Sequence, residues 1–172
     1  SIGYMAFDGC HSLTSVTIPN SVTSIGYSAF FSCDDEAATA AKIAAILEEP
    51  PRMGNSDLGV AFSRNQPAWQ QRSQQLLKRL NVRGGEADSS LIAPLLAGAF
   101  ADRIARRRGQ DGRYQLANGM GAMLDANDAL SRHEWLIAPL LLQGSASPDA
   151  RILLALPVDI DELVQRCPQL VQ

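Results

Sequence analysis

Residues 101–115 read ADRIARRRGQDGRYQ, and this stretch decides the fold of the second half of the chain. Apolar positions on both sides of a Gly-Gln-Asp-Gly break are typical of a β-hairpin. Glycine at both ends of the break lets the backbone adopt positive φ without a Cβ penalty. The first strand and the start of the second carry five arginines, Arg103, Arg106, Arg107, Arg108 and Arg113. The sequence therefore predicts an arginine-rich hairpin.

The residues after this hairpin predict a small barrel. Short apolar runs alternate with turn residues, such as Asn118-Gly119, and Pro157 is expected to stop the last run. Five strands in so short a segment suit the OB-fold, which often carries oligonucleotides. We expect a closing helix from Asp159, with acidic residues at its positive end. The expected strands are 102–107, 114–117, 122–125, 135–142 and 151–156.

The residues before the hairpin predict helices. Asp34 or Asp35 is a candidate cap for a helix that ends near Glu48, before Pro50-Pro51. Further helices are expected at 57–63, from Pro67 to about residue 80, and from Ser89 or Ser90 to about Phe100. One apolar stripe on the helix that begins at Pro67 contains Trp69, Leu76, Leu77 and Leu80. We therefore interpret Trp69 as a core anchor rather than a stacking platform for bases.

The N-terminus repeats itself. Residues 1–7, SIGYMAF, recur as SIGYSAF at residues 24–30, an offset of 23 residues. A fixed period of this length indicates a solenoid, with a short strand expected at 15–18. The segment 1–33 resembles the BspA-like leucine-rich repeats, a resemblance that implies protein binding on a concave face. One and a half units cannot bury an apolar face, so this stub is expected either to dock on the rest of the chain or to fray, without a binding function of its own.

The composition describes a soluble globular chain, with 46% hydrophobic and 19% charged residues. The net charge of −3 hides an uneven distribution. Residues 52–113 carry 11 basic and 5 acidic groups, a balance that is compatible with a polyanionic partner. The apolar runs are too short to cross a membrane, and no signal peptide is expected. The three cysteines show no metal-binding spacing, so neither a disulfide framework nor a zinc site is predicted.

The run DRIARRRG, followed by GRYQLANGMGAMLDANDALSRHEWLIAPLLL, resembles the HrpB-type ATP-dependent helicases, relatives of the DEAH-box RNA helicases. The resemblance covers residues 34–172. It implies a helical, ratchet-like segment at 34–100, an OB-fold-like domain at 101–172 and a cytoplasmic location. It also implies two partners, single-stranded RNA and the motor domains that this chain lacks. We interpret the pairing with a BspA-like stub as a chimera rather than a natural domain arrangement.

A phosphate-binding loop places Gly-Lys-Ser/Thr under the β and γ phosphates. The two lysines, Lys42 and Lys78, do not follow glycine, and no Asp-Glu-x-His motif is present. We therefore expect no catalytic residues and no nucleotide hydrolysis. ATP and magnesium would belong to the absent motor domains, and the chain itself is expected to hold no cofactor.

The candidate nucleic-acid-binding residues are Arg103, Arg106, Arg107, Arg108, Arg113 and Tyr114. Guanidinium groups pair with phosphates and stack on bases, and Tyr114 would add a stacking surface. The alternative is a solvated strand edge that the arginines protect from aggregation. No metal site is predicted; Asp125 and Asp128 are expected in a loop or a helix cap. Because neighbouring residues of a strand point to opposite sides, His133 and Glu134 are not expected to act as an acid/base pair.

The sequence thus predicts an α+β chain with a repeat stub, a helical bundle and a five-stranded OB-like barrel with a C-terminal helix. The first functional hypothesis is a non-catalytic helicase accessory fragment that binds or guides single-stranded nucleic acid. The alternative is a protein–protein interaction or scaffold module with an inert stub.

Overall fold

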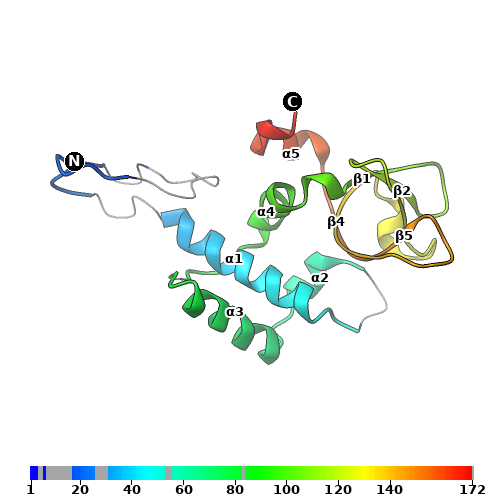
Figure 1. Cartoon of the computed structure of the whole chain (residues 1–172), viewed down its shortest axis with the longest axis horizontal. Helices are drawn as coiled ribbons and strands as arrows, with labels where there is room; N and C mark the ends of the chain where they lie inside the picture. Colours follow the sequence, from blue (N-terminus) through cyan, green and yellow to red (C-terminus); the bar gives the residue numbers. More distant parts are fainter. Residues whose placement is uncertain (4–5, 7–16, 26–30, 53–55, 83, 172) are drawn as a thin grey trace.

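The computed structural model describes residues 1–3, 6, 17–25, 31–52, 56–82 and 84–171. It has the expected α+β class, with helices followed by a closed barrel and a C-terminal helix (Figure 1). Within the described residues, no helix is both long enough and apolar enough to span a membrane.

The described part of the N-terminal stub keeps the periodicity of its sequence. Ile2 pairs in parallel with Ile25, the residue 23 positions later, and its N–H donates to the carbonyl of Ser24 at 2.8 Å. Equivalent residues of successive repeats thus lie side by side, as in a solenoid. Ile18 and Ile25 remain 37% and 47% exposed. The apolar face is therefore poorly covered, as expected for so few repeats. The predicted strand at 15–18 lies partly outside the described residues.

Helix α1 spans Phe31–Glu48, so it begins before the predicted boundary between Cys33 and Asp34. The prediction of Asp34 or Asp35 as the cap is wrong, because Asp34 already lies in the first turn. There its charge still complements the positive end of the helix. The predicted end at Glu48, ahead of the Pro50-Pro51 pair, is confirmed.

Two shorter helices follow, α2 (Leu58–Phe62) and α3 (Pro67–Arg79). Asp57, the predicted first residue of this helix, instead caps α2, and its carboxylate accepts from the N–H of Gly59 at 2.8 Å. Pro67 occupies the first turn of α3, where its missing N–H costs nothing.

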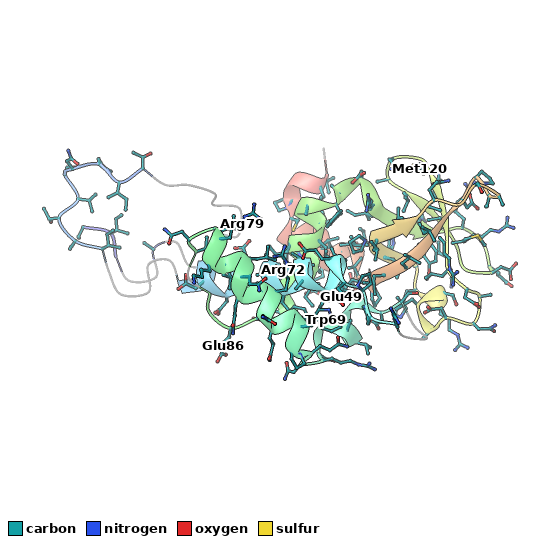
Figure 2. All side chains as sticks on the ribbon, turned by 60° about the horizontal axis from the view of Figure 1, so that its bottom comes forward. Glu49, Trp69, Arg72, Arg79, Glu86 and Met120 are labelled. Atoms are coloured by element: carbon teal, nitrogen blue, oxygen red, sulfur yellow. The ribbon has the colours of Figure 1, made fainter. Side chains whose placement is uncertain are left out.

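Trp69 of α3 is 2% exposed, which confirms its predicted role in the core, and its indole N–H donates to the carbonyl of Glu49 at 3.0 Å. Arg72, one turn further, forms a two-pronged pair with Glu48 at 2.5 and 2.9 Å. Figure 2 shows Trp69 and Arg72 facing the end of α1. The prediction for Leu80 is wrong: it is 69% exposed because α3 ends at Arg79 and Asn81 turns the chain with φ of 54°.

The chain then reaches the barrel through α4 (Ile92–Ala99), which lies between short 3-10 turns at Ser89–Leu91 and Ala101–Arg103. The residue that caps the first turn is Asp88, not the predicted Ser89 or Ser90; its carboxylate accepts from the N–H of Ser90 at 2.8 Å. Helix α4 contacts α1, β4 and α5, and so lies between the helices and the barrel (Figure 1).

The five predicted strands are present. They are β1 (Ile104–Arg107), β2 (Arg113–Leu116), β3 (Gly121–Met123), β4 (Trp135–Leu142) and β5 (Ala150–Pro157). They close in the order β1-β2-β3-β5-β4, with β3 and β5 parallel and the other neighbours antiparallel. The predicted bounds of β4 agree with the structure, and β5 continues to Pro157. Helix α5 (Ile160–Arg166) follows, capped by Asp159.

The helices and the barrel share one hydrophobic core. A cluster that includes Ile46 of α1 and Trp69 of α3 also contains Ile137 of β4 and Leu154 of β5. The segment before α2 joins the sheet as well, since the N–H of Ala155 donates to the carbonyl of Ser56 at 2.8 Å. Although the chain changes from helices to strands near residue 100, the two parts therefore pack around a common core. A second cluster fills the barrel itself.

Candidate nucleic-acid interface

The arginine-rich hairpin has the predicted turn. Gly109 and Gly112 adopt φ of +67° and +70°, the left-handed region that glycine accepts readily. The N–H of Arg108 donates to the carbonyl of Arg113 at 2.8 Å, so these two residues lie opposite each other where the strands meet the turn. Because alternate residues of a strand share a face, Arg106 lies on the same side of β1 as Arg108.

Barrel closure brings a fourth arginine to this face. Arg113 of β2 lies opposite Met123 of β3, Met123 lies opposite Arg151 of β5, and Arg151 lies opposite Leu142 of β4. Side chains opposite each other in a sheet point to the same side. We call the outward-facing row Arg106, Arg108, Arg113 and Arg151 the arginine wall; all four are exposed.

Arg151 is not among the residues that the sequence predicts for the site. The alternation of buried and exposed residues in β5 could have shown that it points outward. Its neighbours, however, follow from the parallel pairing of β5 with β3, which only the closed barrel shows.

Two of the predicted site arginines lie elsewhere. The Arg103 guanidinium donates to the carbonyl of Pro139 at 2.6 Å and lies 5.4 Å from the centre of the Phe100 ring. The Arg107 guanidinium donates to the carbonyl of Arg132 at 2.9 Å. Arg107 lies opposite the inward-facing Tyr114, so strand alternation turns it away from the arginine wall. Both residues therefore have structural contacts of their own.

Tyr114 is 1% exposed, so the prediction that it forms a stacking surface is wrong. Its hydroxyl lies 2.7 Å from the carbonyl of His133 and 2.9 Å from that of Leu130, and it can donate to either. Burial raises the pKa of Tyr114 to about 12, so the phenol stays protonated and remains a donor at neutral pH. The strand period places this residue in the core: it alternates with the exposed Arg113 and Gln115.

Replacing Tyr114 with phenylalanine is expected to lower the free energy of unfolding by about 1–2 kcal/mol, because a buried carbonyl loses its donor while the ring still fills the core. Chemical denaturation followed by circular dichroism measures this. An unchanged free energy of unfolding would show that the hydrogen bond from the Tyr114 hydroxyl does not stabilise residues 130–133, the segment before β4.

Two adjoining hollows lie beside the arginine wall. One, of about 360 Å³, is lined by Arg108, Arg113 and Asp149, among others. The other, of about 610 Å³, is lined by Arg151, Asp149 and apolar side chains that include Met123 and Leu142. Asp149 lines both hollows, so they adjoin each other, and we call the two together the groove. The groove offers cationic and apolar surface together with two carboxylates, the half-buried Asp149 and the exposed Asp125.

Asp149 reaches this position because Gly121 has no side chain: a Cβ there would collide with the Asp149 carboxylate. Asp125 lies in a loop and Asp128 caps the 3-10 turn Ala129–Arg132, as predicted. Asp125 accepts from the N–H of Asn127 and Asp128 from that of Leu130, both at 2.9 Å. Across the described ranges, no three histidine, cysteine or acidic side chains are grouped so that they could hold a metal ion.

The strand order and the arginine wall define a small OB-like barrel with a basic outer face. Over 139 residues, or 81% of its length, the chain is 99% identical to the ATP-dependent RNA helicase HrpB of Escherichia coli strain K12. The predicted segment 34–172 also contains 139 residues, the same number as the match. The match covers 17% of HrpB, so the chain spans about a sixth of that relative.

Solved structures agree. The chain is similar to the crystal structure of the E. coli DExH-box NTPase HrpB, with a TM-score of 0.77 and 99% identity. It is also similar to that of the Escherichia coli DEAH/RHA helicase HrpB, with a TM-score of 0.73 and 88% identity. Each match covers 81% of this chain and 17% of the other. The predicted resemblance to the HrpB-type helicases is confirmed.

The N-terminal resemblance is confirmed as well. The family of BspA type leucine rich repeat regions matches residues 1–47. The match extends beyond the predicted end at Cys33 and into α1.

Proposed function

We propose that the arginine wall binds single-stranded RNA weakly. In this proposal the chain guides a strand and does not hydrolyse nucleotides. The observation that carries this proposal is the convergence of four exposed arginines from β1, β2 and β5 on one face. Guanidinium groups suit phosphate oxygens, and a row of them can follow a phosphate backbone.

The groove beside the arginine wall favours a single-stranded ligand over a duplex. Unstacked bases need apolar or planar surface, and Met123 and Leu142 offer apolar surface next to Arg151. Leu142 is 54% exposed, so its side chain is accessible to a base in the groove. The relative that matches most of the chain is named an RNA helicase, which favours RNA over other polyanions. In this proposal, ATP and magnesium bind to the motor domains of the helicase and not to this chain.

The test is fluorescence anisotropy of a labelled single-stranded RNA, titrated with the full chain at several salt concentrations. We expect a dissociation constant on the order of 10–100 μM at physiological salt, typical of non-specific binding. The variant Arg108→Ala/Arg113→Ala/Arg151→Ala should bind about 100-fold more weakly, since each phosphate contact is worth about 1 kcal/mol. The slope of log K against log salt should become about 2 units shallower, because three phosphate contacts are lost.

A control with the same charge change is Arg52→Ala/Arg64→Ala/Arg79→Ala, since these arginines are exposed and lie outside the barrel. This control should bind like the unmodified chain. Equal losses in the two triple variants would show that only net charge matters. No binding at low salt would reject the proposal and favour the interaction-module hypothesis, which a pull-down of helicase motor domains would then address.

Nucleotide hydrolysis by the chain, above the background of a buffer control, would reject the non-catalytic part of the proposal.

A further inference from the structure

Trp135, Arg106 and Glu134 form a cluster at one end of the arginine wall. Arg106 of β1 lies opposite Trp135 of β4, with its guanidinium carbon 5.4 Å from the centre of the indole ring. The same guanidinium lies 3.5 Å from the Glu134 carboxylate. One arginine thus contacts an aromatic face and a carboxylate at once.

The backbone holds this cluster in place. The N–H of Arg107 donates to the carbonyl of Glu134 at 2.8 Å, and the N–H of Val158 donates to that of Trp135 at 3.1 Å. The side chains, in contrast, are open to solvent: those of Arg106 and Glu134 are 64% and 61% exposed. An exposed ion pair contributes little to stability, so a ligand can replace it at small cost.

The charge of the cluster distinguishes it from the rest of the wall. Glu134 neutralises Arg106 and repels phosphate, whereas Arg108, Arg113 and Arg151 outnumber the two carboxylates of the groove, Asp125 and Asp149, and attract it. An indole ring and a guanidinium plane are both surfaces on which nucleobases stack. The cluster therefore suits a base, and the other arginines suit the phosphates on either side of it.

We propose that Trp135, Arg106 and Glu134 form a base-binding subsite that prefers guanine. The inference rests on the proposed function, since the strand is held by the wall. An ionised carboxylate only accepts hydrogen bonds. The Watson–Crick edge of guanine presents two adjacent donors, N1–H and the N2 amino group. Adenine and cytosine place an acceptor beside their amino group, and uracil places its single donor between two carbonyls. Glu134 therefore pairs best with guanine.

The test uses the full chain and four RNA pentamers that differ only in their central base: UUGUU, UUAUU, UUCUU and UUUUU. Binding is followed by tryptophan fluorescence as well as by anisotropy. Trp69 is 2% exposed, whereas Trp135 is half-buried on the outer wall, so quenching by RNA reports on Trp135. We expect quenching by every pentamer and about tenfold tighter binding of UUGUU than of UUAUU.

The variant Glu134→Gln should reduce this preference to less than about twofold while UUUUU still binds, because an amide presents one acceptor and one donor, not two acceptors, to the adjacent N–H groups of guanine. Glu162→Gln is the matched control: it removes another exposed partner of an arginine, Arg166, at a distance from the wall, and should keep the preference. Trp135→Ala should weaken every pentamer about tenfold, and Trp135→Phe should restore part of that loss.

Equal affinity for all four pentamers, or a preference that Glu134→Gln leaves intact, would overturn the guanine assignment. Absence of quenching would overturn the subsite as a whole. In both cases, loss of UUUUU binding in the triple arginine variant would still support the proposed function. Failure of all four pentamers to bind would reject both proposals.

Discussion

Replacing Trp69 with alanine is expected to lower the free energy of unfolding by about 3–5 kcal/mol, the usual cost of truncating a fully buried aromatic side chain. Trp69 is 2% exposed and belongs to the cluster that joins the helices to the barrel. Its N–H also supplies a donor for the Glu49 carbonyl at the end of α1. Such a loss is a large part of the 5–15 kcal/mol typical of a folded domain. Urea denaturation followed by circular dichroism measures it.

The same experiment tests whether the shared core makes one cooperative unit. Circular dichroism at 222 nm reports mainly on the helices, and Trp135 fluorescence reports on the barrel. Because Ile137 and Leu154 pack in the same cluster as Trp69, both signals should move together to a lower urea midpoint in Trp69→Ala. A fluorescence transition that keeps its original midpoint would show that the barrel folds independently of the helices. Trp69→Phe, which keeps a ring but loses the N–H, should cost about 1–2 kcal/mol.

Replacing Gly112 with alanine is expected to cost about 2–4 kcal/mol. A left-handed φ of +70° costs an L-residue about 1–2 kcal/mol. A Cβ at this position would also lie 2.5 Å from the carbonyl oxygen of Leu124, which is backbone and cannot rotate away. Shifting it would strain the nearby hydrogen bond of 2.9 Å from the Leu124 N–H to the Gly112 carbonyl. The free energy of unfolding from urea titrations checks this cost.

Gly109 provides a matched control in the same turn. Its φ of +67° is nearly the same, but a Cβ there would meet nothing within 4 Å. Gly109→Ala should therefore cost only the conformational part, about 1–2 kcal/mol. Equal costs for the two variants would contradict the contact with Leu124. The comparison separates backbone conformation from packing at two glycines of one hairpin.

Much of the local structure could be predicted from residues that act on their own neighbours. Asp57 caps α2 and Pro67 starts α3 because both effects operate within one helical turn. The glycines of the β1–β2 turn have the positive φ that their spacing implied. Strand β4 has the predicted bounds. The 23-residue period brings Ile2 beside Ile25, since repeated sequences stack through equivalent residues.

Long-range pairing decided the candidate site. The run of arginines in the sequence could not show that Arg103 and Arg107 donate to carbonyls elsewhere, because their partners come from distant segments. Arg151 joins the wall through the β3–β5 pairing, and Trp135 meets Arg106 through the β1–β4 pairing. Sequence by itself determined where strands, turns and caps form, because these depend on contacts within a few residues. Only the closed barrel decided which side chains share a face, because register between distant strands is a property of the whole core.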